Sequence, residues 1–100
     1  MQWIKTNRSF LDLIPERSGI YMITVENTVV YVGKAKYLQT RIKQHFSDSE
    51  SNMDLKNIIQ HYQVSILYTE VVSESELCRI ESALYYQYRP RCNQIAPPRY

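Results

Sequence analysis

The sequence predicts an α/β (α+β) domain in which a small three-stranded antiparallel sheet is flanked by helices. Two short runs of strand-forming residues, 20–25 and 29–32, are separated only by the polar linker 26–28, which has the length of a hairpin loop. A third run, 63–72, is rich in β-branched and aromatic residues. Apolar residues at helical spacing occupy most of the remaining chain, so helices should pack on the sheet.

Size and composition limit the class of protein. One hundred residues can bury one hydrophobic core but not two, so we expect a single domain, 1–100. The chain is 44% hydrophobic and 22% charged, as is typical of soluble globular proteins. It contains no apolar run of membrane-spanning length and no signal peptide, so we expect a cytoplasmic protein that makes no membrane contact. Cys78 and Cys92 lack the spacing of a metal site or disulfide framework, and we expect reduced thiols.

Four helical segments are expected around the strands. The first, 9–14, is short and ends at Pro15. The second covers 37–46 and the third 54–62, each with an apolar stripe along one side. The last begins at Ser73, where Ser73-Glu74-Ser75-Glu76 fits a capping box, and continues to about residue 88, before Pro90.

The predicted hairpin contains two similar tripeptides, Gly19-Ile20-Tyr21 and Tyr31-Val32-Gly33. If the loop between the strands has an odd number of residues, Tyr21 and Tyr31 project from the same face of the sheet, because side chains alternate with period two. Cations follow closely in the sequence. Two phenols beside several cations indicate a site that handles an anion.

The charge pattern is informative although the net charge is only +2, which is too small to indicate a nucleic-acid-binding protein. Seven of the 12 basic residues form two clusters, and acidic residues concentrate elsewhere, at 48–54 and 70–76. Each basic cluster is either a solvated surface or a binding surface. The clusters are Lys34, Lys36, Arg41 and Lys43, and Arg89, Arg91 and Arg99.

Glu81 interrupts the apolar stripe of the last helix, four residues after Leu77 and three before Leu84. An unpaired charge facing the core is costly, so Glu81 either lies at the rim, pairs with a buried arginine, or serves as a metal ligand or acid–base group. His45 lies one turn after Arg41 beside another apolar stripe. It is either a packed or surface residue, or a phosphate contact or proton-transfer group.

These residues together resemble the GIY-YIG nuclease superfamily over nearly the whole chain. The match comprises the two tripeptides, Arg41 eight residues after Gly33, Glu81 in the last helix and Asn93 after it. The flanking sequences 14–16, 31–36 and 88–93 look most like the N-terminal incision domain of the bacterial nucleotide-excision-repair nuclease. Either tripeptide alone would be weak evidence, whereas five elements in the right order are specific.

The resemblance implies a DNA-repair endonuclease that hydrolyses phosphodiesters with one divalent cation, Mg²⁺ or Mn²⁺. It places the metal on Glu81, and makes Tyr31 the base that deprotonates water, assisted by Lys34. Arg41 would stabilise charge on the phosphate, as arginine does generally. The full implied catalytic set is Tyr21, Tyr31, Lys34, Arg41, His45, Glu81 and Asn93, and the residues expected to contact nucleic acid are Lys34, Lys36, Arg41, Lys43, Arg89 and Arg91.

The resemblance is incomplete at two positions. His45 stands where the repair nucleases often carry tyrosine, which leaves the general base open between Tyr31 and His45. Cys92 replaces a frequent tyrosine. We expect DNA as the partner, with specificity supplied by a protein partner or by self-association, since relatives join this module to other domains. The alternative function is a catalytically silent module of the same fold that binds nucleic acid or recruits a partner.

Overall fold

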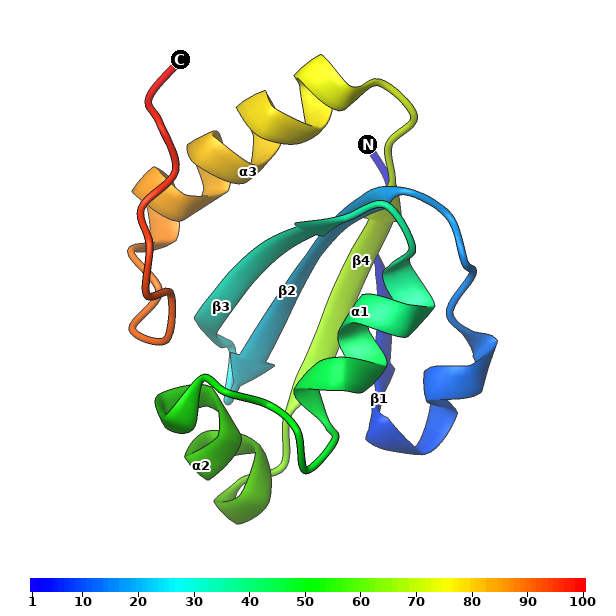
Figure 1. Cartoon of the computed structure of the whole chain (residues 1–100), viewed down its shortest axis with the longest axis vertical. Helices are drawn as coiled ribbons and strands as arrows, with labels where there is room; N and C mark the ends of the chain where they lie inside the picture. The colour runs from blue at the N-terminus through cyan, green and yellow to red at the C-terminus, as the bar shows by residue number, and fades with distance from the viewer.

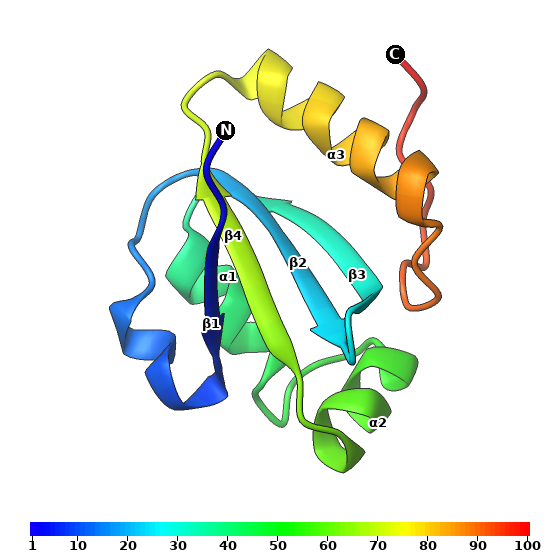
Figure 2. The same cartoon turned by 180° about the vertical axis from the view of Figure 1, so that it is seen from behind.

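The chain folds into one four-stranded antiparallel sheet with helices on both faces, as seen in a computed structural model that describes residues 1–100 (Figures 1 and 2). The elements follow in the order β1 (Ile4–Asn7), the 3₁₀ helix η1 (Arg8–Leu13), β2 (Gly19–Val25), β3 (Thr28–Ala35), α1 (Leu38–His45), α2 (Met53–His61), β4 (Ser65–Glu70) and α3 (Glu74–Tyr88). The strands are arranged β1-β4-β2-β3. The predicted α+β class is therefore confirmed.

The prediction of three strands was wrong by one, because β1 adds a strand next to β4. Ile4 pairs with Tyr68 and Asn7 with Ser65. Three of its four residues are exposed, so the segment has no alternation of apolar and polar residues that could mark it as a strand. Backbone hydrogen bonds to β4 define it instead.

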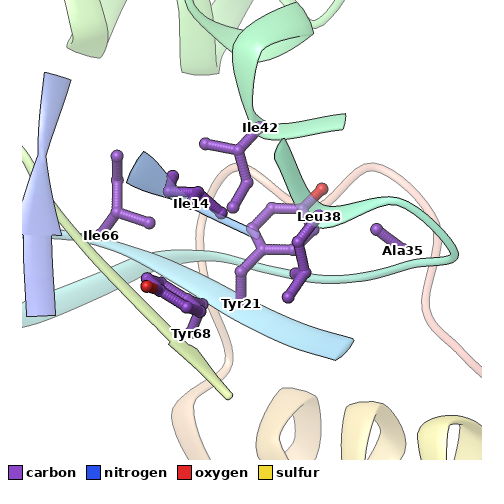
Figure 3. Close-up of a cluster of buried hydrophobic side chains, with 7 residues drawn as sticks. All are labelled: Ile14, Tyr21, Ala35, Leu38, Ile42, Ile66 and Tyr68. Carbon is purple, nitrogen blue, oxygen red and sulfur yellow. The ribbon is translucent and has the colours of Figure 1, made fainter. Parts of the chain in front are cut away.

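The two faces of the sheet carry different helices. Tyr21 packs with Leu38 and Ile42 of α1 in the core cluster shown in Figure 3. Ile20, the neighbouring residue of β2, points to the other face and packs with Leu77 of α3. Adjacent residues of β2 thus belong to different cores, which explains why six of its seven residues are buried. A third cluster, formed by α2 against the ends of β2 and β3, includes Ile23, Val30 and Leu55.

Helix ends follow the sequence signals. Asn52 caps α2 by accepting a hydrogen bond from the backbone of Leu55, and Ser73 caps α3 by accepting one from Glu76 at 3.4 Å. α3 ends at Tyr88, and the next residue, Arg89, caps it in a left-handed conformation directly before Pro90. No helix combines the length and the apolar character that crossing a membrane requires.

Candidate active site

A bulge in the hairpin brings the two motif tyrosines to one face. The loop has two residues, Glu26 and Asn27, both with positive φ, as in a type I′ turn. A regular ladder from this turn would place Tyr31 opposite Met22, on the wrong face. Instead the register shifts between Ile23 and Thr24, and Tyr31 pairs with Ile23. The odd loop length considered in the sequence analysis was wrong, and the extra residue lies within the strand.

Both glycines of the chain lie where a Cβ atom would collide with its surroundings. Gly33 pairs with Tyr21 across the ladder, and a Cβ there would overlap the phenol ring. A Cβ on Gly19 would overlap the carbonyl oxygen of Thr69 and the side chain of Leu38. Gly33 therefore provides the space that the Tyr21 ring occupies beside β3.

A cavity of about 340 Å³ opens beside β3. Four of the seven predicted catalytic residues line it, although they come from β3, α1, α3 and the C-terminal segment. Tyr21, His45 and Lys34 do not line it. The lining residues are Tyr31, Arg41, Glu50, Ser51, Asn52, Glu81, Asn93, Gln94 and Ile95.

Behind Tyr31 lies a buried hydrogen-bonded chain. The Tyr21 hydroxyl is 2.6 Å from Nε2 of His45, and Nδ1 of His45 is 3.2 Å from Oε2 of Glu50. The exposed fractions of Tyr21, His45 and Glu50 are 0%, 1% and 9%. The Tyr31 ring stacks on Tyr21 with centroids 6.0 Å apart and meets His45 edge-on at 4.8 Å. Tyr31 thus separates Tyr21 and His45 from the cavity, whereas Glu50 also contributes to the cavity wall.

Burial shifts the pKa values of Tyr21, Tyr31 and His45. It raises the pKa of Tyr21 well above its usual value, with a further contribution from the neighbouring Tyr31. Burial also raises the pKa of Tyr31, and the positive charge of Arg41 opposes that change. For His45, burial and then Arg41 lower the pKa to about 4, while Glu50 acts in the opposite direction. His45 is therefore a neutral imidazole at neutral pH.

Glu81 lies half-buried in α3 and faces the cavity. No hydrogen bond or ion pair of the structure involves its carboxylate. Burial raises its pKa, and Lys34 opposes that change. An incompletely solvated carboxylate without a partner is suited to a cation. No group of three or more His, Cys, Asp or Glu residues gathers here, so the donor set fits a hard cation that takes one carboxylate, water and phosphate oxygens.

Asn93 anchors the C-terminal segment to the outer edge of β3. Its Nδ2 donates to the carbonyl of Val32 and its Oδ1 accepts from the Val32 backbone N–H, both at 2.9 Å. The Cys92 backbone N–H donates to Val30, and Asn52 donates to the Cys92 carbonyl at 2.7 Å. Because both ends of its amide are engaged, Asn93 supports the cavity rather than offering a free ligand atom.

All of the other predicted cations lie outside the cavity. Lys34 donates to Sγ of Cys78 at 3.1 Å, and both cysteines are free thiols. Lys43 forms an exposed ion pair with Asp12. Arg89 lies 5.2 Å from the centroid of the Tyr86 ring, and Lys36 is exposed beyond the end of β3. Arg91 borders a separate depression near the hairpin turn. Of the predicted nucleic-acid contacts, only Arg41 lines the cavity.

Glu50 and Asn52 are not among the residues predicted from the sequence. Both lie in the polar loop between α1 and α2, which looked like an ordinary serine- and acid-rich connection. The only signal was an acidic residue five positions after His45, and that spacing has no regular structural meaning outside a helix. The loop conformation, fixed by the hydrogen bond from the Asn52 backbone N–H to Oε1 of Glu50, brings the carboxylate to His45.

Comparison with known proteins identifies the family of this chain. Residues 17–94 match the family of UvrC-like GIY-YIG domains. The chain belongs to this family. The resemblance noted from the motif residues is thereby confirmed, since that stretch contains Gly19 through Asn93.

Relatives of this UvrC-like GIY-YIG domain include much longer proteins. The UvrABC system protein C of Clostridium tetani is 33% identical over 84 residues, covering 83% of this chain and 14% of that protein. The corresponding protein of Protochlamydia amoebophila is 37% identical over 89 residues, covering 85% and 14%. The chain thus spans about one-seventh of the length of the curated relatives it matches.

Solved structures share the fold. The N-terminal GIY-YIG endonuclease domain of UvrC from Thermotoga maritima, bound to its catalytic divalent cation magnesium, superposes with a TM-score of 0.74 at 27% identity, covering 86% of this chain and 93% of that one. Bacteriophage T4 EndoII, as its E118A mutant, has a TM-score of 0.60 at 16% identity, covering 80% and 76%, which shows the fold alone.

Proposed function

We propose that this UvrC-like GIY-YIG domain is a metal-dependent endonuclease that hydrolyses DNA phosphodiester bonds with one divalent cation. The supporting observation is that three chemically different groups line one cavity although they come from three separate elements. These groups are the hydroxyl of Tyr31, the permanent cation of Arg41 and the unpaired carboxylate of Glu81. The names of the relatives support a role in DNA repair, with DNA as substrate.

Glu81 would hold the cation, Mg²⁺ or Mn²⁺. Such an ion, when bound, polarises the phosphate, lowers the pKa of water and shields the leaving oxygen. Glu81 contributes its ionised form, which the nearby positive charge of Lys34 favours by opposing the effect of burial on its pKa. We infer that Lys34 supports Glu81, because it donates to Cys78 and does not line the cavity with Tyr31.

Arg41 would bind the scissile phosphate and stabilise the charge that develops on it. Its guanidinium donates one hydrogen bond within the protein, to Gln44, and most of its five N–H groups are left for a phosphate. Held in place on α1, this charge is preorganised for the transition state, which is commonly the largest contribution to catalysis.

Tyr31 would contact the attacking water, because it is the only tyrosine among the lining residues. His45 is buried behind it and cannot touch water or phosphate directly. This division favours Tyr31 as the group next to the substrate and gives His45 an indirect role through Tyr21. Asn93 would keep the edge of β3, and with it Tyr31, in position.

Binding of the DNA backbone would extend beyond the cavity to exposed cations, chiefly Lys36 and Arg89. Lys43 would contribute least, since it is paired with Asp12. Because the net charge is only +2, we expect weak and strongly salt-dependent binding, with specificity supplied by a protein partner or by self-association.

The proposal is tested by incubating the protein with supercoiled plasmid and with branched or flapped DNA, in Mg²⁺, in Mn²⁺ and in EDTA. We expect nicking that requires the metal and is lost in Glu81→Ala. The matched control is Glu76→Gln, which removes an exposed carboxylate from the same helix. DNA binding without cleavage of any substrate would instead identify a catalytically silent module, and equal cleavage by Glu81→Ala would refute the role of Glu81.

A further inference from the structure

Glu50 is a buried carboxylate for which the mechanism above has no role. Its exposed fraction is 9%, and both of its oxygens are engaged. Oε2 lies 3.2 Å from Nδ1 of His45, and Oε1 accepts the backbone N–H of Asn52 at 3.1 Å. An ionised carboxylate can only accept hydrogen bonds, so it must face a donor on each side. The loop supplies one donor, and the second must be His45.

The hydrogen bonds around His45 specify one tautomer. If Nδ1 carries the proton and donates it to Glu50, then Nε2 has a lone pair and must accept. The Tyr21 hydroxyl lies 2.6 Å from Nε2 and can donate there. The opposite tautomer would place a lone pair of Nδ1 against the carboxylate. The network is therefore consistent with only one set of hydrogen bonds: the Tyr21 hydroxyl donates to Nε2 of His45, and Nδ1–H of His45 donates to Glu50.

We propose that Glu50 is a positioning residue of the nuclease site, whose carboxylate holds the buried His45 ring as the Nδ1–H tautomer so that Nε2 can accept the hydroxyl proton of Tyr21. The inference rests on the proposed function for its catalytic meaning. It concerns the pair His45 and Glu50. Glu50 lies in a loop that contains no motif residue.

The arrangement gives the proton of the attacking water a destination. Tyr31, at the cavity surface, takes that proton and passes its own to the Tyr21 hydroxyl, whose side-chain hydrogen bond opposes the rise that burial causes in the pKa of Tyr31. The O–H bond of Tyr21 breaks as an N–H bond forms at Nε2 of His45. The resulting imidazolium then lies between the Tyr21 hydroxyl and the Glu50 carboxylate, which stabilises its charge. One proton leaves the water and one is gained by His45.

Glu50→Gln is the informative substitution, because an amide has only one acceptor oxygen. If that oxygen faces His45, the amide NH₂ meets the backbone N–H of Asn52 and two donors oppose each other. If it faces Asn52, the NH₂ donates to Nδ1, and His45 must move its proton to Nε2, opposite the Tyr21 hydroxyl. The second orientation is favoured, because the Tyr21 hydroxyl can accept from Nε2–H and no two buried donors then face each other. Glu50→Gln should therefore shift the His45 tautomer while nearly preserving side-chain volume. Glu76→Gln is the control, and a thermal melt of each variant verifies folding.

The direct measurement is the tautomer of His45 from nitrogen NMR of the DNA-free protein at neutral pH. The chain has one other histidine, His61, whose Nδ1 faces the carbonyl of Asn57 at 2.8 Å. His61 is therefore an internal reference with the same expected tautomer. We expect His45 as Nδ1–H in the wild type and a shift toward Nε2–H in Glu50→Gln, with His61 unchanged. An Nε2–H tautomer in the wild type, or no change in the variant, would overturn the proposal.

The kinetic measurement tests the consequence. We expect Glu50→Gln to lower kcat for plasmid nicking about 10-fold to 100-fold with little change in KM, within the range of general acid–base effects. In a His45→Gln background, which has no imidazole to orient, Glu50→Gln should cost nothing further. Additive losses, or an unchanged kcat despite a changed tautomer, would overturn the proposal. A wild type that cleaves no DNA would refute the proposed function separately, since the tautomer is measured without DNA.

Discussion

The inner and outer halves of the site satisfy their polar groups in opposite ways. In the inner half, Tyr21, His45 and Glu50 are buried and hydrogen-bonded to one another. In the outer half, Tyr31, Arg41 and Glu81 face the cavity, and the Glu81 carboxylate has no partner at all. Groups that the protein satisfies itself stabilise the fold, whereas groups left unsatisfied can bind a ligand. Substitutions in the two halves should therefore affect different quantities.

The largest expected effect is on activity in the outer half. Glu81→Gln should lower the cleavage rate about 10³-fold or more, because a bound cation contributes several kcal/mol to transition-state stabilisation. The free energy of unfolding should stay constant or rise slightly, since the variant removes a half-buried charge without a partner. Plasmid nicking and urea unfolding measure the two effects. A large loss of stability would show that Glu81 has a structural role.

Acid should act on the inner half. The pKa of His45 is lowered to about 4, chiefly by burial and then by Arg41, while an unfolded histidine titrates near 6.5. Between these values the unfolded chain binds the extra proton, so stability falls as the pH drops from about 6.5 to 4 and is fully present above that range. At about 1.4 kcal/mol per pH unit, the loss is about 3 kcal/mol.

Urea unfolding at pH 7 and pH 4.5, compared between the wild type and His45→Gln, isolates this contribution. Glu81 acts in the opposite direction, because its raised pKa makes the folded state take up a proton first. The informative quantity is therefore the difference between the two proteins. An identical loss of stability in acid for both would exclude His45 as the cause.

Tyr21 in the inner half and Tyr31 in the outer half form a matched pair for substitution. Tyr21→Phe leaves the buried Nε2 of His45 without a donor and should lower the free energy of unfolding by about 1–3 kcal/mol. Tyr31→Phe removes a hydroxyl that faces the cavity, so the free energy of unfolding should change little while cleavage falls. Thermal melts and nicking assays on both variants make the test. Equal destabilisation by both would remove the distinction between the two halves.

The smallest effect concerns the surface cations. Lys36 is exposed, and no hydrogen bond or ion pair involves it, whereas Lys43 is paired with Asp12. If Lys36 contacts a phosphate, Lys36→Gln should reduce the slope of log affinity against log salt by about 1. Lys43→Gln should leave the slope nearly unchanged. Fluorescence anisotropy with a labelled DNA at several salt concentrations measures both, and a larger effect of Lys43→Gln would contradict the comparison.

The sequence predicted the outer half of the site better than the inner half. Tyr31, Arg41 and Glu81 were identifiable because each stood in a motif or interrupted an apolar stripe, and the structure places them around one cavity. Glu50 was not identifiable from the sequence, because its position depends on a loop conformation that no periodicity encodes. β1 was missed for a similar reason, since backbone pairing rather than a side-chain pattern makes it a strand.

Tyr21 and Tyr31 lie on the same face of the sheet, as expected, but not for the expected reason. With regular pairing, an odd loop length is the condition for placing Tyr21 and Tyr31 on one face. The loop has two residues, and the bulge at Val30 supplies the missing residue. Turn length can be estimated from polar residues, but a bulge inside a run of β-branched residues leaves no compositional signal.

The attachment of Asn93 to Val32 has a consequence for self-association. A sheet strand with unpaired backbone groups is a template on which another chain can add a strand. Cys92 and Asn93 occupy the middle of the β3 edge by bonding to Val30 and Val32. The opposite edge, β1, is only four residues long. The same amide that shapes the cavity therefore also protects the sheet against edge-to-edge aggregation.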